Sequence, residues 1–199
     1  MRMLFNAANA QWRVLPRPLF SAAQKNWLTR GGSLTQRLQT LGRVEVQVVR
    51  EAVDFAWAGE AHCLKARARQ RVWAREVLLL VEGEPFIAAR SIAPLSASRG
   101  VWADIRQLHT RSLSELLYGG VIKRSALASR PIGKGDPLYR FIQRCFERAA
   151  LRRDLTPPLS AAPVARRSIF MHAGQPLLVT ECMLAALWLR LAEPNRQTG

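Results

Sequence analysis

The sequence predicts an α+β fold in a single domain, with a mostly antiparallel sheet. Two segments, 75–86 and 166–177, have the pattern of β-hairpins, because Glu82-Gly83 and Ala173-Gly174 each suit a two-residue turn. Helical stretches are inserted between strands without regular alternation, which favours α+β over a parallel α/β sheet. The 199 residues, of which 49% are hydrophobic, are enough for one core.

The chain before the first hairpin is predicted to contribute helices and one strand. Residues 24–41 are helical in pattern, and Ser33 is placed to cap the second part of this stretch. Residues 44–48 alternate between apolar and polar side chains, as a half-buried strand does. Residues 55–70 have no clear period and are predicted to be a loop.

Between the hairpins we expect helices that pack over the sheet. Short helices are predicted at 101–108 and 113–118, ending at Gly119-Gly120, where a positive φ is easily adopted. An extended stretch at 121–129 follows. A longer helix at 138–153 and a proline-rich linker at 156–163 then lead to the second hairpin.

The register of the hairpins places charges inside apolar surfaces. Counting across two-residue turns puts Arg75 opposite Arg90, and Arg166 opposite Glu181. Because like charges opposite each other are destabilising, we expect an anion at the first pair. Glu181 is a candidate to neutralise one guanidinium, which leaves another to hold a small acid through a bidentate contact. The alternative is an ordinary buried ion pair between arginine and glutamate.

The chain is strongly basic, with 30 Lys and Arg against 14 Asp and Glu and a net charge of +16. Such a balance suits nucleic acid, an anionic membrane surface, or an arginine-rich composition without a specific partner. We find no zinc-ligand spacing, no aromatic and basic sheet signature, and no basic helix followed by a zipper. The sequence therefore gives no support for specific nucleic-acid binding.

Basic residues cluster in two places. All charged residues before Glu45 are basic, so residues 1–18 are predicted to form a flexible basic tail, followed by a domain at 19–190 and a second tail at 191–199. In the helix at 138–153, arginines recur four residues apart on one side. This stripe is either a solvated face or a docking surface for anionic membrane or a partner, and its members are Arg140, Arg144, Arg148 and Arg152.

Cysteine and histidine spacing gives no indication of a metal site. Cys63, Cys145 and Cys182 are far apart and odd in number, which favours free thiols in a reducing compartment, and hence a cytoplasmic protein. The histidines do not form a pair at helical spacing, so no metal is expected. No apolar run reaches the roughly 20 residues that a membrane-spanning helix needs.

Several motifs together resemble the chorismate lyase family, which forms 4-hydroxybenzoate and pyruvate from chorismate. They are SLTQRL at 33–38, WAREVLL at 73–79 with GEP at 83–85 and AR at 89–90, ARRS at 165–168, and GQPLLVTE at 174–181. The resemblance implies helical flaps that close over a buried ligand site. One departure is QLHTRSLS at 107–114, where relatives more often have Leu-Gly and Pro-Leu-Gly, so the flap is expected to differ.

The resemblance also implies roles for individual residues. Arg75 would hold the ring carboxylate, and Glu181 would meet the ring hydroxyl and is the candidate base. Backbone groups at Leu34 and Leu113 would complete the binding site, and we expect Arg90 to supply positive potential for the second carboxylate. Substrate-binding residues are thus Leu34, Arg75, Arg90, Leu113 and Glu181, with Arg75 and Glu181 as the catalytic pair.

The expected reaction is an elimination of pyruvate from chorismate that needs no cofactor and gives 4-hydroxybenzoate, as a first committed step of ubiquinone head-group synthesis. The alternative is a non-catalytic domain that senses an aromatic acid. The effector-binding domains of some bacterial transcription regulators are similar in fold to this family, and fold alone does not separate catalyst from sensor. No helix-turn-helix module is found ahead of the domain, which favours the enzyme.

Overall fold

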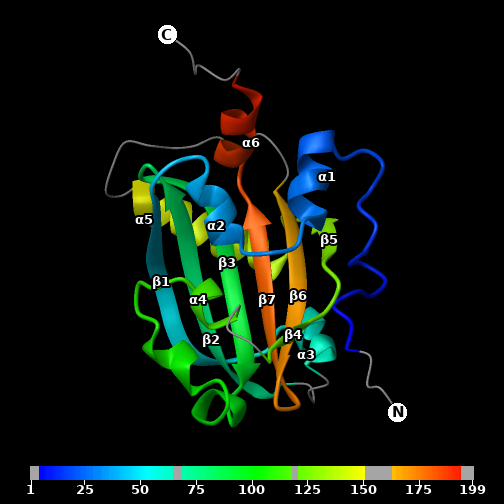
Figure 1. Cartoon of the computed structure of the whole chain (residues 1–199), viewed down its shortest axis with the longest axis vertical. Coiled ribbons are helices and arrows are strands. Elements are labelled where there is room, and N and C mark those ends of the chain that lie inside the picture. The colour runs from blue at the N-terminus through cyan, green and yellow to red at the C-terminus, as the bar shows by residue number, and fades with distance from the viewer. Residues whose placement is uncertain (1–4, 65–68, 118–120, 151–162, 194–199) are drawn as a thin grey trace.

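The computed structural model describes residues 5–64, 69–117, 121–150 and 163–193 (Figure 1). Within these, seven strands form one antiparallel sheet with the order β1-β2-β3-β7-β6-β4, and β5 also pairs with β6. The predicted α+β fold is confirmed. The strands are β1 (Val44–Phe55), β2 (Arg71–Val81), β3 (Glu84–Pro94), β4 (Lys123–Arg124), β5 (Ala128–Pro131), β6 (Val164–His172) and β7 (Gln175–Met183).

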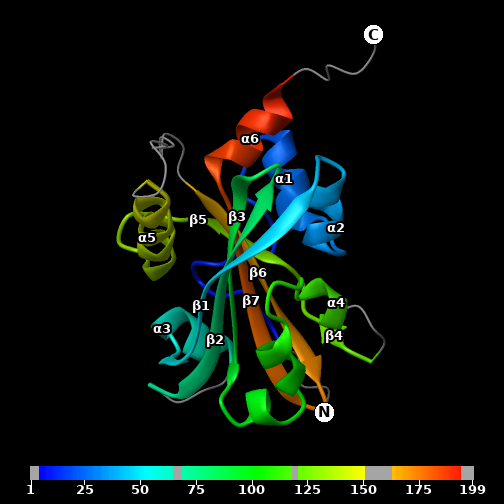
Figure 2. The same ribbon diagram turned by 90° about the vertical axis from the view of Figure 1, so that its left-hand side faces the viewer.

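Helices cover both faces of the sheet (Figure 2). On one face lie α1 and α2 together with α4, and on the other lie α3 and α5. The short 3-10 helices η1 and η2 precede α4, and α6 follows β7 at one end of the sheet. The helices are α1 (Ala22–Thr29), α2 (Leu34–Gln39), α3 (Ala58–Cys63), η1 (Ala97–Arg99), η2 (Ala103–Gln107), α4 (Ser114–Leu117), α5 (Pro137–Ala150) and α6 (Ala185–Ala192).

Both predicted two-residue turns are present. Glu82 and Gly83 have φ values of 50° and 81°, and Ala173 and Gly174 have 45° and 76°. Positive φ at both central residues matches the twist of the flanking strands, and the glycine at the second position adopts it without steric cost. In the second hairpin Arg166 lies opposite Glu181, as the sequence predicted.

The register predicted for the first hairpin is wrong. Arg75 lies opposite Ser91, and Arg90 lies opposite Glu76. The cause is an irregularity next to the turn, because Leu80 pairs with Pro85 while Leu79 pairs with Ile87, so that β3 carries one extra residue. A shift of one residue moves every later side chain of a strand to the other face, so Arg75 and Arg90 lie on opposite sides of the sheet.

Elements before the first hairpin are longer or more regular than expected. Ser21 and Ser33 cap α1 and α2, since their hydroxyl groups accept hydrogen bonds from Gln24 N and Gln36 N. The predicted strand at 44–48 extends to Phe55. The stretch at 55–70 is not only a loop, because it contains α3.

The stretch between the hairpins is also more divided than predicted. Two 3-10 helices and the four-residue α4 occupy the region of the two expected helices. The extended stretch at 121–129 is split into β4 and β5. The linker at 156–162 and Gly119-Gly120 lie outside the described residues.

Within the described part of the chain before Pro18, residues 5–13 do not form the loose tail that the composition suggested. Ala7 and Trp12 are buried in the core on the α5 face of the sheet. Arg13 pairs with Ser129 through two backbone hydrogen bonds, and the backbone oxygen of Ala7 accepts one from Arg167 Nε at 2.7 Å. Residues 5–13 therefore pack onto the domain.

The core on the other face is divided between the two ends of the sheet. One apolar cluster joins α1, α2 and α6 to the sheet, and another joins η1, η2 and α4 to it. In the part of the chain that the structure describes, no helix is long and apolar enough to span a membrane. The three cysteines are buried, and none of them forms a disulfide bond within the described residues.

Candidate active site

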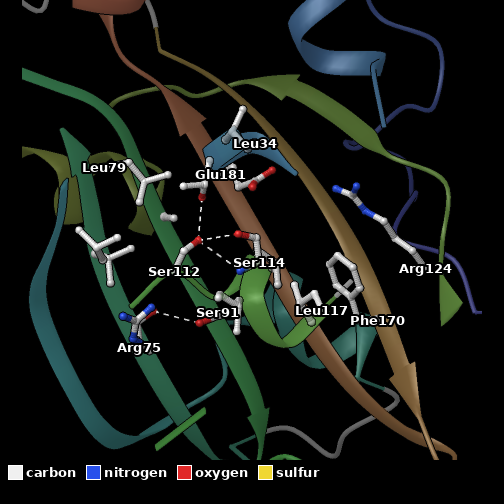
Figure 3. A pocket seen from close by; sticks show the side chains of 16 residues that line it. Leu34, Arg75, Leu79, Ser91, Ser112, Ser114, Leu117, Arg124, Phe170 and Glu181 are labelled. Carbon is white, nitrogen blue, oxygen red and sulfur yellow. Dashed lines mark hydrogen bonds between the residues drawn. The ribbon is translucent and has the colours of Figure 1, made fainter. Parts of the chain in front are cut away.

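A partly open cavity of about 50 Å³ lies on the face of the sheet that α2 and α4 cover (Figure 3). Its floor comes from the sheet, and its cover comes from α2 and from residues 112–117. Most of the lining is apolar, which excludes water and strengthens electrostatic contacts inside. The apolar lining residues are Leu34, Val46, Val77, Leu79, Ala89, Leu113, Leu117, Phe170 and Val179.

Arg75 on β2 supplies a buried cation to this cavity. Its side chain is 2% exposed, and its Nε donates a hydrogen bond to Glu51 Oε1 at 2.8 Å. Its Nη2 donates to the backbone oxygens of His109 and Arg111 at 2.7 and 3.1 Å. Burial lowers the pKa of Arg75, and Glu51 opposes that shift. These contacts fix the guanidinium against β1 and residues 109–111, and its Nη1 makes no hydrogen bond within the described residues.

Glu181 on β7 supplies a carboxylate to the same cavity. Arg166, its cross-strand neighbour, donates a hydrogen bond from Nε to Glu181 Oε2 at 2.7 Å. Arg166 Nη1 is itself held by the backbone oxygens of Trp27 and Arg30 at 2.8 and 3.0 Å. The Glu181 side chain is 15% exposed and that of Arg166 is 1% exposed. A fixed arginine thus orients one carboxylate oxygen, and Figure 3 shows the Glu181 side chain within the lining.

Three hydroxyl groups join the two segments that cover the cavity. Ser112 Oγ lies 2.7 Å from Thr35 Oγ1 and 2.8 Å from Ser114 Oγ (Figure 3). Leu34 and Leu113 are adjacent in sequence to Thr35 and Ser112, and both line the cavity. The hydroxyl chain therefore joins the two covering segments next to Leu34 and Leu113.

Arg124 on the edge strand β4 is a second arginine in the lining. Its Nε donates a hydrogen bond to Ser168 Oγ at 2.9 Å, and its Nη1 donates to the backbone oxygen of Gly32 at 3.2 Å. The guanidinium carbon lies 5.0 Å from the ring centroid of Phe170. This cation is thereby held over β6.

The charges around the cavity favour an anionic ligand. The cations are Arg75, Arg124 and the Arg166 side chain behind Glu181, whereas the anions are Glu181 and the Glu51 side chain behind Arg75. Each carboxylate is already paired with one arginine. Among the described residues, three arginines thus lie around a mostly apolar cavity, where an added carboxylate gains more than it would in water.

Of the residues predicted for the site, Leu34, Arg75, Leu113 and Glu181 meet at this cavity. Arg90 is not among the lining residues. It lies on the α3 face, because the extra residue in β3 reverses the side to which it points. The prediction that Arg90 adds positive potential to the site therefore has no support in the geometry.

Arg90 instead joins a buried group of charges on the far face. Its Nε and Nη1 donate to Glu60 Oε1 and Glu76 Oε1 at 2.8 and 2.6 Å, and its Nη1 lies 3.7 Å from Asp54 Oδ2. Its guanidinium carbon is 4.0 Å from the ring centroid of Trp57. Burial opposes the charged form, but Glu60 and the other carboxylates raise the pKa of Arg90. These contacts give Arg90 a structural role.

Sequence reasoning missed several residues of the site. Glu51 was overlooked because the strand was expected to end at Val48, although it lies directly opposite Arg75 once β1 continues. Arg124 follows no local pattern, since it reaches the cavity only through pairing of the short β4 with β6. The remaining missed residues, Thr35, Ser112 and Ser114, are common surface types whose spacing has no signature.

Comparison with known proteins agrees with this geometry. A family model described as chorismate lyase matches residues 7–192. The chain belongs to the chorismate lyase family. Chorismate lyases are enzymes, so the protein is a lyase.

The chain is similar to proteins named probable chorismate pyruvate-lyase. One from Bordetella avium is 37% identical over 92% of this chain and 87% of the relative, and one from Bordetella pertussis is 41% identical over 83% of each. Among solved structures, the C-terminal domain of a histidine utilization repressor from Pseudomonas syringae is 13% identical, with a TM-score of 0.48 over 79% of this chain and 100% of that one.

Proposed function

We propose that this lyase converts chorismate into 4-hydroxybenzoate and pyruvate, without a cofactor. The observation that carries the proposal is the cavity that Arg75 and Glu181 line together with Leu34 and Leu113. A ligand with a carboxylate at one end and a hydroxyl at the other complements this arrangement. The family of the chain and the arginines around the cavity support the same class of ligand.

The reaction requires little covalent chemistry from the protein. The bond between the ring and the enolpyruvyl oxygen breaks, and the ring carbon that bears the hydroxyl loses its proton. The electron pair of that carbon–hydrogen bond completes the aromatic ring, and the enolpyruvate that leaves is protonated to pyruvate. Aromatisation supplies the driving force, so the protein has to position the ring, exclude water and receive a proton.

Two residues are assigned to these tasks. Arg75 binds the ring carboxylate, since its guanidinium is fixed by Glu51 and by two backbone oxygens with Nη1 still available. Glu181 meets the hydroxyl end and accepts the ring proton, or orients the carbon that loses it. Arg166 keeps the Glu181 carboxylate in one orientation.

Incubation of the purified protein with chorismate, without added metal or cofactor, tests the proposal directly. We expect 4-hydroxybenzoate and pyruvate to appear in equal amounts. Absence of turnover together with tight binding of 4-hydroxybenzoate would contradict catalysis, and would favour the aromatic-acid sensor instead.

Glu181→Gln is expected to lower the turnover number by about 10²-fold, the usual scale for loss of a general base. The affinity for 4-hydroxybenzoate should change little, because the amide still offers an oxygen to the hydroxyl. Steady-state kinetics and calorimetry measure the two quantities. Glu84→Gln is a matched control, since Glu84 is exposed at the start of β3. Near-normal turnover of the Glu181 variant would remove the base role.

We infer that the 4-hydroxybenzoate serves as the head-group precursor of ubiquinone, made in the cytoplasm. The support is the family of the chain and the reaction proposed above. Expression in a bacterium that lacks its own chorismate lyase should restore the ubiquinone content of lipid extracts. An unchanged quinone content, with active lyase in the same cells, would contradict this destination.

We also infer that α5 contacts anionic membranes. Arg140 and Arg144 are exposed on this helix, whereas Phe141 and Ile142 on its other side are buried. The side chain of Arg148, like the whole of Arg152, lies outside the described residues. Because the apolar side is occupied by the core, binding would be electrostatic and without insertion, at about 1 kcal/mol for each basic residue near the surface.

Vesicle flotation checks this inference. The protein should float with vesicles that contain an anionic lipid at low salt, and should not float with neutral vesicles. Arg140→Gln combined with Arg144→Gln should reduce flotation more than Arg17→Gln combined with Arg99→Gln, which removes the same charge from exposed sites elsewhere. Equal flotation of the two double variants would contradict a role for α5.

A further inference from the structure

Two arginines from strands near opposite edges of the sheet line the cavity on the same face, and the roles proposed above use only Arg75. Arg124 belongs to β4, which is separated from β2 by β3, β7 and β6. With about 4.8 Å between neighbouring strands, their backbones are roughly 19 Å apart. Figure 3 shows the two side chains on either side of the cavity, with Glu181 between them.

The guanidinium of Arg124 lies nearer to Glu181 than that of Arg75 does, as the anchoring contacts indicate. Arg75 Nε donates to Glu51 on β1, so its guanidinium is drawn away from β7. Arg124 Nε donates to Ser168 on β6, the strand next to β7, and Ser168 lies opposite Val179, two residues before Glu181. The cavity therefore has one cation at the far end from Glu181 and another beside it.

Chorismate presents charges in a matching arrangement. Its ring carboxylate and its hydroxyl are on opposite ring carbons, so a ring held by Arg75 directs its hydroxyl to Glu181. The enolpyruvyl ether is attached to the ring carbon next to the hydroxyl. The second carboxylate, at the end of that group, consequently falls near Glu181 and away from Arg75.

We propose that Arg124 binds the carboxylate of the enolpyruvyl group and so selects for a ligand with two carboxylates. This inference rests on the proposed function. It assigns to Arg124 the task that the sequence had suggested for Arg90, which lies on the other face. Ser168, Phe170 and the backbone of Gly32 hold the guanidinium in place before the ligand arrives, so less side-chain freedom is lost on binding.

The test compares ligands with one and two carboxylates. Arg124→Gln should raise KM for chorismate by about 10-fold, less than the loss of a fully buried charge pair would cause, because Arg124 is only half-buried. Its affinity for 4-hydroxybenzoate, which lacks the enolpyruvyl group, should stay within about twofold of wild type. Arg124→Lys retains the charge and should recover part of the loss in KM.

Arg106→Ala is a matched control. Arg106 also stacks on an aromatic ring, with its guanidinium carbon 4.3 Å from the ring centroid of Trp73, but it does not line the cavity. This variant should leave both ligand affinities unchanged. If the lower net charge alone weakened binding, the affinity for chorismate would fall equally in Arg106→Ala and Arg124→Gln. That result would overturn the proposal.

The outcomes separate this inference from the proposed function. Wild-type protein that releases no pyruvate would overturn the function, and the affinity for chorismate would then be measured directly by calorimetry in the same variants. The role of Arg124 would be overturned if Arg124→Gln had the wild-type KM for chorismate. It would also be overturned if the affinity of the variant for 4-hydroxybenzoate fell as much as its affinity for chorismate.

Discussion

Replacing Arg75 by alanine is expected to weaken the binding of 4-hydroxybenzoate by about 30-fold or more. Loss of one partner of a buried, hydrogen-bonded charge pair costs roughly 2–5 kcal/mol, because the other charge is left in an apolar site without compensation. Here that charge is the ligand carboxylate, and the Arg75 side chain is only 2% exposed. The dissociation constant from calorimetry measures the effect.

Two further variants make this result specific. Arg75→Lys keeps the charge but lacks the planar fork, so it should bind 4-hydroxybenzoate more weakly than wild type and more tightly than Arg75→Ala. Arg106→Ala should bind like wild type, since Arg106 does not line the cavity. Arg75 also donates hydrogen bonds to the backbone oxygens of His109 and Arg111, so its replacement could affect folding. Thermal unfolding therefore has to show that the variants are folded. Unchanged affinity in folded Arg75→Ala would refute the anchor.

The parts of this fold that the sequence predicted correctly depend on local chemistry. Gly83 and Gly174 supply the positive φ of tight hairpin turns, and Ser33 supplies the hydroxyl that caps α2. In the second hairpin the pairing stays regular from the turn to Arg166 and Glu181, so counting residues gave the correct partners. The part of the candidate site on the second hairpin therefore follows from the sequence alone.

The first hairpin shows where this reasoning fails. One extra residue in β3, between Pro85 and Ile87, changes the partner of Arg75 from Arg90 to Ser91. That residue is Phe86, which is 2% exposed and packs in the cluster formed with α1, α2 and α6. The bulge accompanies burial of this side chain by helices distant in sequence, and the turn residues alone do not encode it.

Other errors have the same origin in long-range packing. The basic residues before Pro18 suggested a tail, yet Trp12 is 4% exposed and contacts Arg130 and Arg167, whose guanidinium carbons lie 4.7 and 4.3 Å from its ring. Arg124 reaches the cavity from an edge strand of two residues. Neither contact follows from local periodicity, because both depend on which strands become neighbours in the sheet.

The new position of Arg90 leads to a prediction about stability rather than ligand binding. Arg90→Ala should lower the free energy of unfolding by about 3–5 kcal/mol, the scale for breaking a buried ion pair. Its side chain is 0% exposed, and those of Glu60 and Glu76 are 7% and 3% exposed, so the variant leaves two buried carboxylates without their cation. Urea unfolding monitored by circular dichroism measures the change. In the fraction that remains folded, the affinity for 4-hydroxybenzoate should be that of wild type.

A second substitution and a control separate buried charge from lost packing. Glu76→Gln in the Arg90→Ala background should restore part of the stability, because it removes one of the uncompensated carboxylates. Arg50→Ala also removes an arginine that contacts Asp54, but the Arg50 side chain is 44% exposed, so its loss should cost less than about 1 kcal/mol. If Arg90→Ala were as stable as Arg50→Ala and bound 4-hydroxybenzoate poorly, Arg90 would act in ligand binding after all. Loss of stability with intact binding would instead mean that the two faces of the sheet have different roles. Arg90 on one face would stabilise the fold, and Arg75 on the other would bind the ligand.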